Sequence, residues 1–225
     1  MRDLCSGPRL SAPSSAIKGQ RATLTQRVDQ ENLMEHKERP ITPVKRFILT
    51  GTPSSGKTAI VRQLEIDGYD VIEEAATDVI ALQQAGNIAE PWLDSSFISA
   101  IVKLQRERQL RGSTHSGNIQ FHDRSPVCTY ALATYLGFPI PDVLAREMER
   151  IEQDRIFQKE VFFIQNLGSV TKTGARRISY GDAVRFERIH EETYRAFGYE
   201  IVPISPGTVR QRVEAIRRFI EVRTE

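Results

Sequence analysis

Eight residues early in the chain have the types and the spacing of a phosphate-binding loop. They fit the pattern G-x-x-x-x-G-K-[ST] at every fixed position. Backbone N–H groups of such a loop point inward, and the dipole of the following helix adds positive charge, so the loop attracts anions. The lysine would reach the β- and γ-phosphates of a nucleotide, and the threonine hydroxyl would ligate Mg²⁺. The loop consists of Gly51, Thr52, Pro53, Ser54, Ser55, Gly56, Lys57 and Thr58.

The segments on either side of this loop support the same interpretation. Residues 46–50 form an apolar run typical of a strand, and residues 59–65 have the apolar spacing of a helix. A strand, a loop bounded by glycines and a helix N-terminus together make an anion site. A chance match in a loop rich in Gly, Ser and Thr is the alternative, and the flanking pattern argues against it. The sequence therefore predicts a site for ATP or GTP with Mg²⁺.

Charged side chains follow two further predicted strands, 70–72 and 119–122. In open α/β sheets, ligands bind at the carboxyl ends of the strands, so we expect these side chains near the loop. Asp123 is the candidate for the metal-side carboxylate, and its alternative role is a cap or a partner of Arg124. Glu74 is the candidate for a general base or an anchor of the acceptor hydroxyl, or else a helix N-terminal acid. Arg124 would hold a phosphate, or would be solvated or ion-paired.

A basic segment at about 166–181 follows the fourth predicted strand and has the composition of a lid. Glycines at both ends and in the middle could act as hinges, and the cations between them would cover the phosphates and exclude water. A solvated basic loop is the alternative. The proposed catalytic cations are Arg176 and Arg177, with Lys172 nearby. A cradle, a metal ligand, a group that orients the nucleophile and cations are the parts that phosphoryl transfer needs.

Two other basic runs have helical spacing, and we expect both to be solvated helix faces. Neither contains interleaved aromatic residues, so the sequence carries no clear nucleic-acid signal. The formal net charge of +2 over 225 residues points to no class of partner. The partners expected are therefore a nucleotide and a small-molecule acceptor. The runs are Lys103, Arg106, Arg108 and Arg111, and Arg210, Arg212, Arg217 and Arg218.

Strand and helix patterns alternate through most of the chain. This alternation predicts an α/β three-layer sandwich with about five parallel strands and helices on both faces. The remaining predicted strands are 161–164 and 199–204. The predicted helices are 75–86, 93–111, one after Pro126, 141–157, 182–197 and a last one with Val209, Val213, Ile216 and Ile220 on one face.

Residues 1–44 differ from the rest because they are rich in breakers and lack a sustained apolar period. We interpret them as a flexible tail before a single domain at 45–225. No apolar run approaches the ~20 residues of a membrane span. The two cysteines, Cys5 and Cys128, form no metal-binding motif and favour a reducing, cytoplasmic compartment.

The stretches GTPSSGKT, VIEEA and FHDRS, the basic lid and the closing strand–helix together resemble the P-loop nucleoside-kinase-like proteins. Among these, the chain is most similar to the AAA-type family that includes the ribosylnicotinamide-kinase domain of NadR-type proteins. The resemblance covers about 46–222 and implies a central parallel sheet and ATP or GTP with Mg²⁺. There are two departures: residues 125–129 lack an acid that many relatives carry, and Ser54 replaces a third glycine. Both weaken the transfer of any one substrate specificity.

Three hypotheses follow for the function. The first is a kinase that moves the γ-phosphate of ATP to a hydroxyl of a small molecule. The second is a regulatory ATPase or GTPase that switches a binding surface, although the chain lacks the guanine-specific Asn-Lys-x-Asp stretch. The third is a nucleotide binder without catalysis, against which Lys57, Thr58 and Asp123 argue together. The acceptor is not specified by the sequence.

Overall fold

The computed structural model describes residues 44–51, 55–112, 117–165 and 180–223. Nearly all of the predicted tail, residues 1–43, lies outside these ranges. So do Thr52, Pro53 and Ser54 of the loop, and residues 166–179 of the predicted lid, which include Arg176 and Arg177.

The described residues form a parallel sheet of five strands in the order β2-β3-β1-β4-β5. This confirms the predicted fold class. The central strand β1 pairs with β3 on one side and β4 on the other, and Leu49 of β1 lies opposite Asp123 of β3. The strands are β1 Lys45–Thr50, β2 Asp70–Ile72, β3 Ile119–Asp123, β4 Glu160–Ile164 and β5 Glu200–Ile204.

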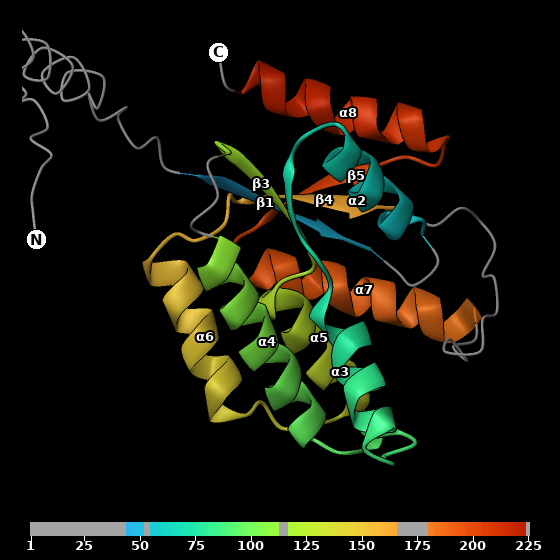
Figure 1. Cartoon of the computed structure of the whole chain (residues 1–225), viewed down its shortest axis with the longest axis vertical. Helices are drawn as coiled ribbons and strands as arrows, with labels where there is room; N and C mark the ends of the chain where they lie inside the picture. Colours follow the sequence, from blue (N-terminus) through green and yellow to red (C-terminus); the bar gives the residue numbers. More distant parts are fainter. Residues whose placement is uncertain (1–43, 52–54, 113–116, 166–179, 224–225) are drawn as a thin grey trace, which may run out of the picture. The chain divides into compact units, whose positions relative to one another are not determined.

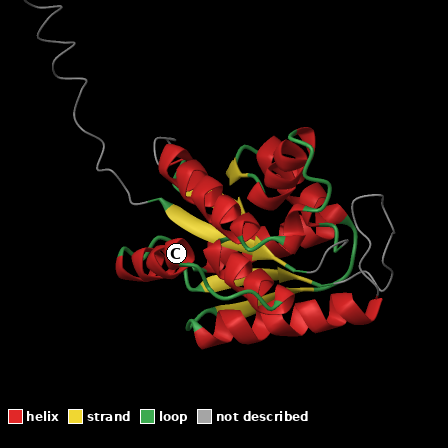
Figure 2. Ribbon diagram, turned by 90° about the horizontal axis from the view of Figure 1, so that it is seen from below, coloured by secondary structure: helices red, strands yellow, loops and turns green. Residues whose placement is uncertain are grey.

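Helices cover both faces of the sheet and give three layers (Figures 1 and 2). One face carries α2 Lys57–Ile66 and α8 Val209–Val222, which pack against each other. The opposite face carries α3 Ala75–Ala85, α4 Ser96–Gly112, α5 Pro126–Leu136, α6 Asp142–Gln153 and α7 Tyr180–Ala196. Within the described residues, no helix is both long and apolar enough to cross a membrane.

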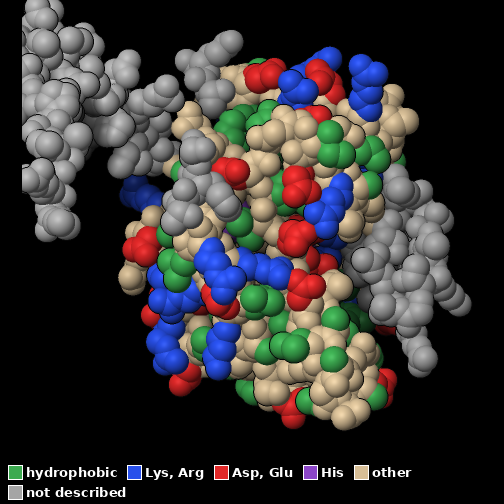
Figure 3. All heavy atoms as spheres, viewed as in Figure 1, with side chains coloured by type: hydrophobic (Ala, Val, Ile, Leu, Met, Phe, Trp, Pro, Cys, Tyr) green, Lys and Arg blue, Asp and Glu red, His purple; other side chains and the backbone are tan. Residues whose placement is uncertain are grey.

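Alternation along the strands divides the core into two clusters, one on each face. On β1, Leu49 belongs to the cluster under α2 and α8, whereas its neighbour Ile48 belongs to the cluster under α3 to α7. The molecular surface seen in Figure 3 carries basic and acidic side chains next to one another. Each face of the sheet thus has its own core cluster, and both clusters are built on the same sheet of five strands.

Two element boundaries differ from the sequence expectation. Helix α6 ends at Gln153 rather than near 157, because Arg155 adopts a left-handed φ of 48° that an α-helix cannot continue. The chain then turns Phe157 into the core, edge-on to the His122 ring at 4.9 Å between centroids. Before α4, a short 3₁₀ turn over Pro91–Leu93 takes up the start of the predicted helix.

Candidate functional site

The two motif glycines are required by the backbone of the loop. Gly51 has φ of 133°, and a Cβ there would lie 2.3 Å from the carbonyl oxygen of Ile164 at the end of β4. Gly56 has φ of 86° and precedes the first residue of α2. As the N-cap residue of α2, Gly56 brings no side chain of its own to this helix N-terminus, where the helix dipole favours an anion. The described part of the loop thus has the backbone that the motif requires of an anion site.

Lys57 is buried, and its Nζ donates a hydrogen bond to the carbonyl oxygen of Gly51 at 3.3 Å. Burial, and after it the positive charge of Arg124, lowers the pKa of Lys57 to about 8, although Asp123 and Glu74 oppose the shift. The ammonium group thus remains mostly protonated at neutral pH. Arg124, Asp123 and Glu74 are close enough to shift the pKa of Lys57. The structure therefore brings together four of the residues selected from the sequence.

Asp123 and Thr58 are the two oxygen donors that the sequence predicts for a metal. Asp123 ends β3 and is 8% exposed, and Thr58 lies exposed in the first turn of α2. Hard oxygen donors suit Mg²⁺, which needs only one or two protein ligands because water and phosphates complete its shell. In the described part of the chain, no cluster of three or more His, Cys, Asp or Glu could hold a metal alone. The donor set fits Mg²⁺ held jointly with a nucleotide.

Glu74 and Arg124 form a partly buried ion pair, with 2.7 Å between Oε1 and Nε. Glu74 is the N-cap residue of α3, and its Oε2 accepts a hydrogen bond from the Thr77 hydroxyl at 3.0 Å. Arg124 has a left-handed φ of 73°, and its backbone N–H donates to the carbonyl oxygen of Leu49 at 3.0 Å. Such strained backbone at a non-glycine residue is common at functional sites. The pair stands beside the phosphate loop.

The charges of this pair stabilise each other. Burial disfavours the ionised form of Glu74, but Arg124, Lys57 and the hydrogen bond from Thr77 outweigh it, and the pKa of Glu74 falls below its usual value. Burial likewise opposes the charge of Arg124, and Glu74 is the largest of the influences that raise its pKa. Both groups are therefore fully charged at neutral pH. The neighbouring Glu73 pairs instead with Arg62 of α2 at 2.7 Å.

Arg108 was expected on a solvated face, and the structure contradicts this. Its side chain is 22% exposed, and Nη1 donates to the carbonyl oxygens of Glu73 at 3.0 Å and Glu74 at 2.6 Å. It also pairs with Asp78. Arg108 therefore fixes the backbone that presents Glu74. The sequence signal for this burial is the position of Arg108, four residues after Leu104, which places it on the apolar face of α4.

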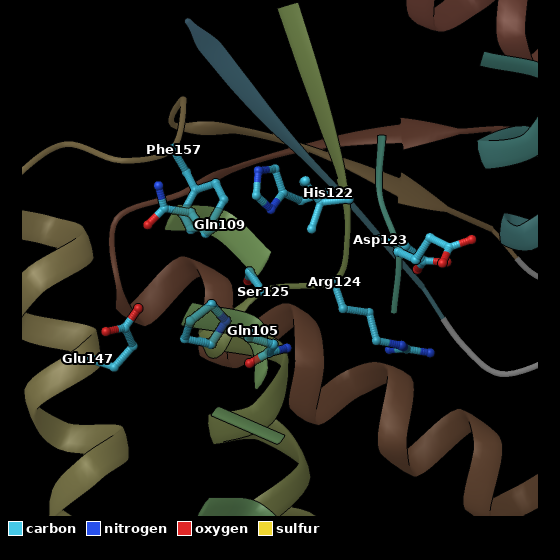
Figure 4. A pocket seen from close by; sticks show the side chains of 11 residues that line it. Gln105, Gln109, His122, Asp123, Arg124, Ser125, Glu147 and Phe157 are labelled. Carbon is cyan, nitrogen blue, oxygen red and sulfur yellow. The ribbon is translucent and has the colours of Figure 1, made fainter. Parts of the chain in front are cut away.

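A narrow pocket adjoins the pair on the side of α4 and α6 (Figure 4). The empty space between the end of β3 and these helices is about 310 Å³, a volume that includes open solvent at the mouth of the pocket. The side chain of Arg124 points away from its centre, whereas several polar groups line it (Figure 4). Sequence reasoning did not select these groups, which are Gln105, Gln109, His122 and Glu147.

His122 is a neutral, hydrogen-bonded side chain of this pocket. Its Nε2–H donates to Gln120 Oε1 at 2.9 Å, and the Gln120 amide is fixed because its Nε2 donates to the Gly112 carbonyl oxygen at 3.0 Å. Burial, and after it the charge of Arg46, lowers the pKa of His122 to about 3. The imidazole next to Asp123 is thus uncharged throughout the physiological range.

Buried hydroxyl and thiol groups tie α7 to the segment that carries Arg124. The Tyr194 hydroxyl lies 2.9 Å from both Ser125 Oγ and Cys128 Sγ. Cys128 Sγ in turn lies 3.2 Å from Thr50 Oγ1 at the end of β1. Burial raises the pKa of Tyr194, so the phenol stays protonated. This chain of contacts holds the carboxyl ends of β1 and β3 in one arrangement.

Three solved structures share this fold at low sequence identity. NadR in complex with NR is 20% identical with a TM-score of 0.60, over 79% of this chain and 51% of that chain. NadR in complex with NAD and AMP-PNP is 19% identical with a TM-score of 0.59, over 89% and 56%. Deoxyadenosine kinase from M. mycoides, with products dCMP and dCDP, is 10% identical with a TM-score of 0.52, over 79% and 99%.

The chain thus spans about half the length of the NadR chains, and at these identities the likeness concerns the fold. A search of curated proteins found no significant match. A family model described as an AAA domain matches residues 46–212, most of the described sheet and its helices. The chain therefore belongs to this AAA domain family.

Proposed function

We propose that the protein is a Mg²⁺-dependent kinase that transfers the γ-phosphate of ATP to a hydroxyl of a small-molecule acceptor. The observation that carries this proposal is the Glu74–Arg124 pair, which stands beside Lys57 and Asp123 at the phosphate loop. A pure nucleotide switch has no need of a second carboxylate, paired with a guanidinium group, beside Asp123. The related NadR structure holds NR and the deoxyadenosine kinase structure holds dCMP and dCDP, which favours a nucleoside-like acceptor.

The phosphates of ATP would bind to the loop amides and to Lys57. Lys57 donates to the loop carbonyl of Gly51, so it is already held where phosphate oxygens would replace that contact. Thr58 and Asp123 would hold Mg²⁺, which supplies charge neutralisation on the phosphates when bound. Arg176 and Arg177, outside the described residues, would add cations from the predicted lid.

Glu74 would orient the acceptor hydroxyl by accepting its hydrogen bond. Its lowered pKa makes it a weak base, so orientation is the stronger part of its role. No partner of the Nη groups of Arg124 lies among the described residues, and these groups would bind the transferring phosphoryl oxygens. The acceptor oxygen forms a bond to Pγ while the bond between Pγ and the bridging oxygen breaks. ADP leaves, and the hydroxyl proton passes to Glu74 or water.

The test uses γ-labelled ATP and Mg²⁺ with pooled nucleosides, cofactor precursors and sugars. Wild type, Lys57→Ala and the matched control Lys103→Ala, an exposed lysine of α4, are compared. We expect a labelled acceptor with wild type and the control, and a loss of ~10²–10³-fold or more for Lys57→Ala, since one preorganised charge contact is removed. Circular dichroism checks folding.

Label found only in inorganic phosphate would instead support a regulatory ATPase. Wild-type turnover in a folded Lys57→Ala protein would exclude the proposed site altogether.

A further inference from the structure

Arg212 of α8 is buried at 3% exposure, contrary to the expectation of a solvated face. Its Nη1 donates to the carbonyl oxygen of Ser55 at 2.7 Å, and its Nη2 donates to that of Gln165 at 2.8 Å. Ser55 belongs to the phosphate loop, and Gln165 directly follows β4. One guanidinium group therefore joins the loop to the end of a neighbouring strand.

The contact with Ser55 also fixes the next amide. A peptide bond is planar and trans, so the carbonyl of Ser55 and the N–H of Gly56 point in opposite directions. No peptide bond among the described residues is cis. Holding the carbonyl toward α8 therefore turns the Gly56 N–H away from α8. A cation bound to the carbonyl also polarises the peptide and makes that N–H a stronger donor.

The backbone that carries Arg212 is held in place by core packing and by a helix cap. Its neighbours Val213 and Ile216 are buried in the core under α2 and α8. The first turn of α8 is closed by a capping box, in which Gln211 and Thr208 bond reciprocally. Its charge also remains near the loop, since no carboxylate among the described residues pairs with Arg212 and an arginine stays protonated.

We propose that Arg212 is a positioning residue that orients the Ser55–Gly56 peptide for binding of nucleotide phosphates. The proposal rests on the proposed function only in taking residues 51–58 as the phosphate site. It adds a residue from the far end of the chain, which contacts the outer side of the loop rather than the ligand.

The experiment is equilibrium displacement of a fluorescent ATP analogue by ATP with Mg²⁺, and separately by inorganic tripolyphosphate. The variants are Arg212→Gln, Arg212→Lys and the matched control Arg210→Gln, an exposed arginine of the same helix turn. We expect Arg212→Gln to weaken both ligands ~10–100-fold, the range typical for removing a support behind a binding group. Arg212→Lys, which keeps the charge and reaches one carbonyl, should lie between Arg212→Gln and wild type.

Equal affinity of wild type and both Arg212 variants, measured where thermal melts show them folded, would overturn the proposal and leave Arg212 a structural residue. Should Arg212→Gln not fold, the Arg212→Lys result decides alone. Wild type that binds ATP but labels no acceptor would contradict the kinase and leave this inference supported if the Arg212 variants bind weakly. Wild type that binds no ATP would overturn both.

Discussion

The two faces of the sheet are built by different means. Under α2 and α8, aromatic rings fill the core: the ring centroids of Phe47 and Phe162 lie 5.6 Å apart, and those of Phe121 and Phe162 6.4 Å. Under α3 to α7, buried polar groups such as His122 and Glu147 accompany the apolar core. Strand β3 supplies Phe121 to one face and His122 to the other.

This difference follows the parts of the site that each face supports. The face under α2 and α8, called here the aromatic face, supports the phosphate loop, whose geometry depends on close packing of strands and helix. The face under α3 to α7, called here the polar face, supports Glu74 and Arg124, where hydrogen bonds set both the positions and the orientations of the side chains. We therefore expect the first face to be sensitive to lost volume and the second to lost charge or hydrogen bonding.

The largest effect is expected for Phe162→Ala on the aromatic face. Phe162 is fully buried and contacts three other rings, so its truncation removes apolar contacts and leaves a cavity. The free energy of unfolding should fall by ~3–5 kcal/mol, measured by denaturant titration. Phe219→Ala, at a partly buried ring of the same cluster, should cost less. Equal losses for both would contradict the idea that volume at the centre of this face is decisive.

A smaller effect is expected for Glu147→Gln on the polar face. Glu147 is 2% exposed, and its carboxylate pairs with Arg150 at 2.7 Å and Arg106 at 3.8 Å. The amide keeps the volume but loses the charge, so unfolding should become easier by about 1–3 kcal/mol. Glu149→Gln, an exposed position of the same helix, is the control and should change little. If Glu147→Gln loses no stability in the same denaturant titration, the proposed difference between the two faces is wrong.

The smallest effect, taken per pH unit, concerns acid and the two described histidines, both on the polar face. Burial, aided by nearby positive charges, lowers the pKa of His122 and of His190 to about 3, against about 6.5 in an unfolded chain. The unfolded chain binds more protons below pH 6.5, so each histidine lowers stability by at most about 1.4 kcal/mol per pH unit on acidification toward pH 3.

The variant His190→Gln removes one of these two titrations. Unfolding titrations at several pH values should therefore show a shallower fall in stability below pH 6.5 than wild type. An unchanged slope of stability against pH would mean that His190 is not neutral in the folded state. The comparison uses the slope rather than the absolute stability, because the substitution also removes the bond from His190 Nδ1 to the Phe186 carbonyl oxygen at 3.0 Å.

The sheet and the loop follow from sequence because both depend on local patterns. The strand at 70–72 has its predicted bounds, and the helix predicted after Pro126 begins at that residue, since turn residues and apolar runs mark both elements. The grouping of Glu74, Asp123 and Lys57 also follows, because parallel strands bring their carboxyl ends to one edge.

The supporting arginines were mispredicted because helical spacing shows which residues share a face but not what lies opposite. Arg212 lies three residues after Val209 and four before Ile216, within the apolar stripe of α8. Its partners are backbone carbonyls more than 40 residues away, and a carbonyl group has no sequence signature. The hydrogen bond of His122 depends in the same way on a backbone carbonyl, because its partner Gln120 is held by the carbonyl oxygen of Gly112 at the end of α4.

The position of β1 has a consequence for biosynthesis. This strand is made early, yet its strand partners among the described residues are 119–123 and 161–163. Contacts of such high sequence separation form late, after much of the chain has left the ribosome. Ser55 of the phosphate loop, although it is encoded near the start of the domain, can bond to Arg212 only when α8 has emerged. A nascent chain halted before α8 would carry the complete motif without this contact.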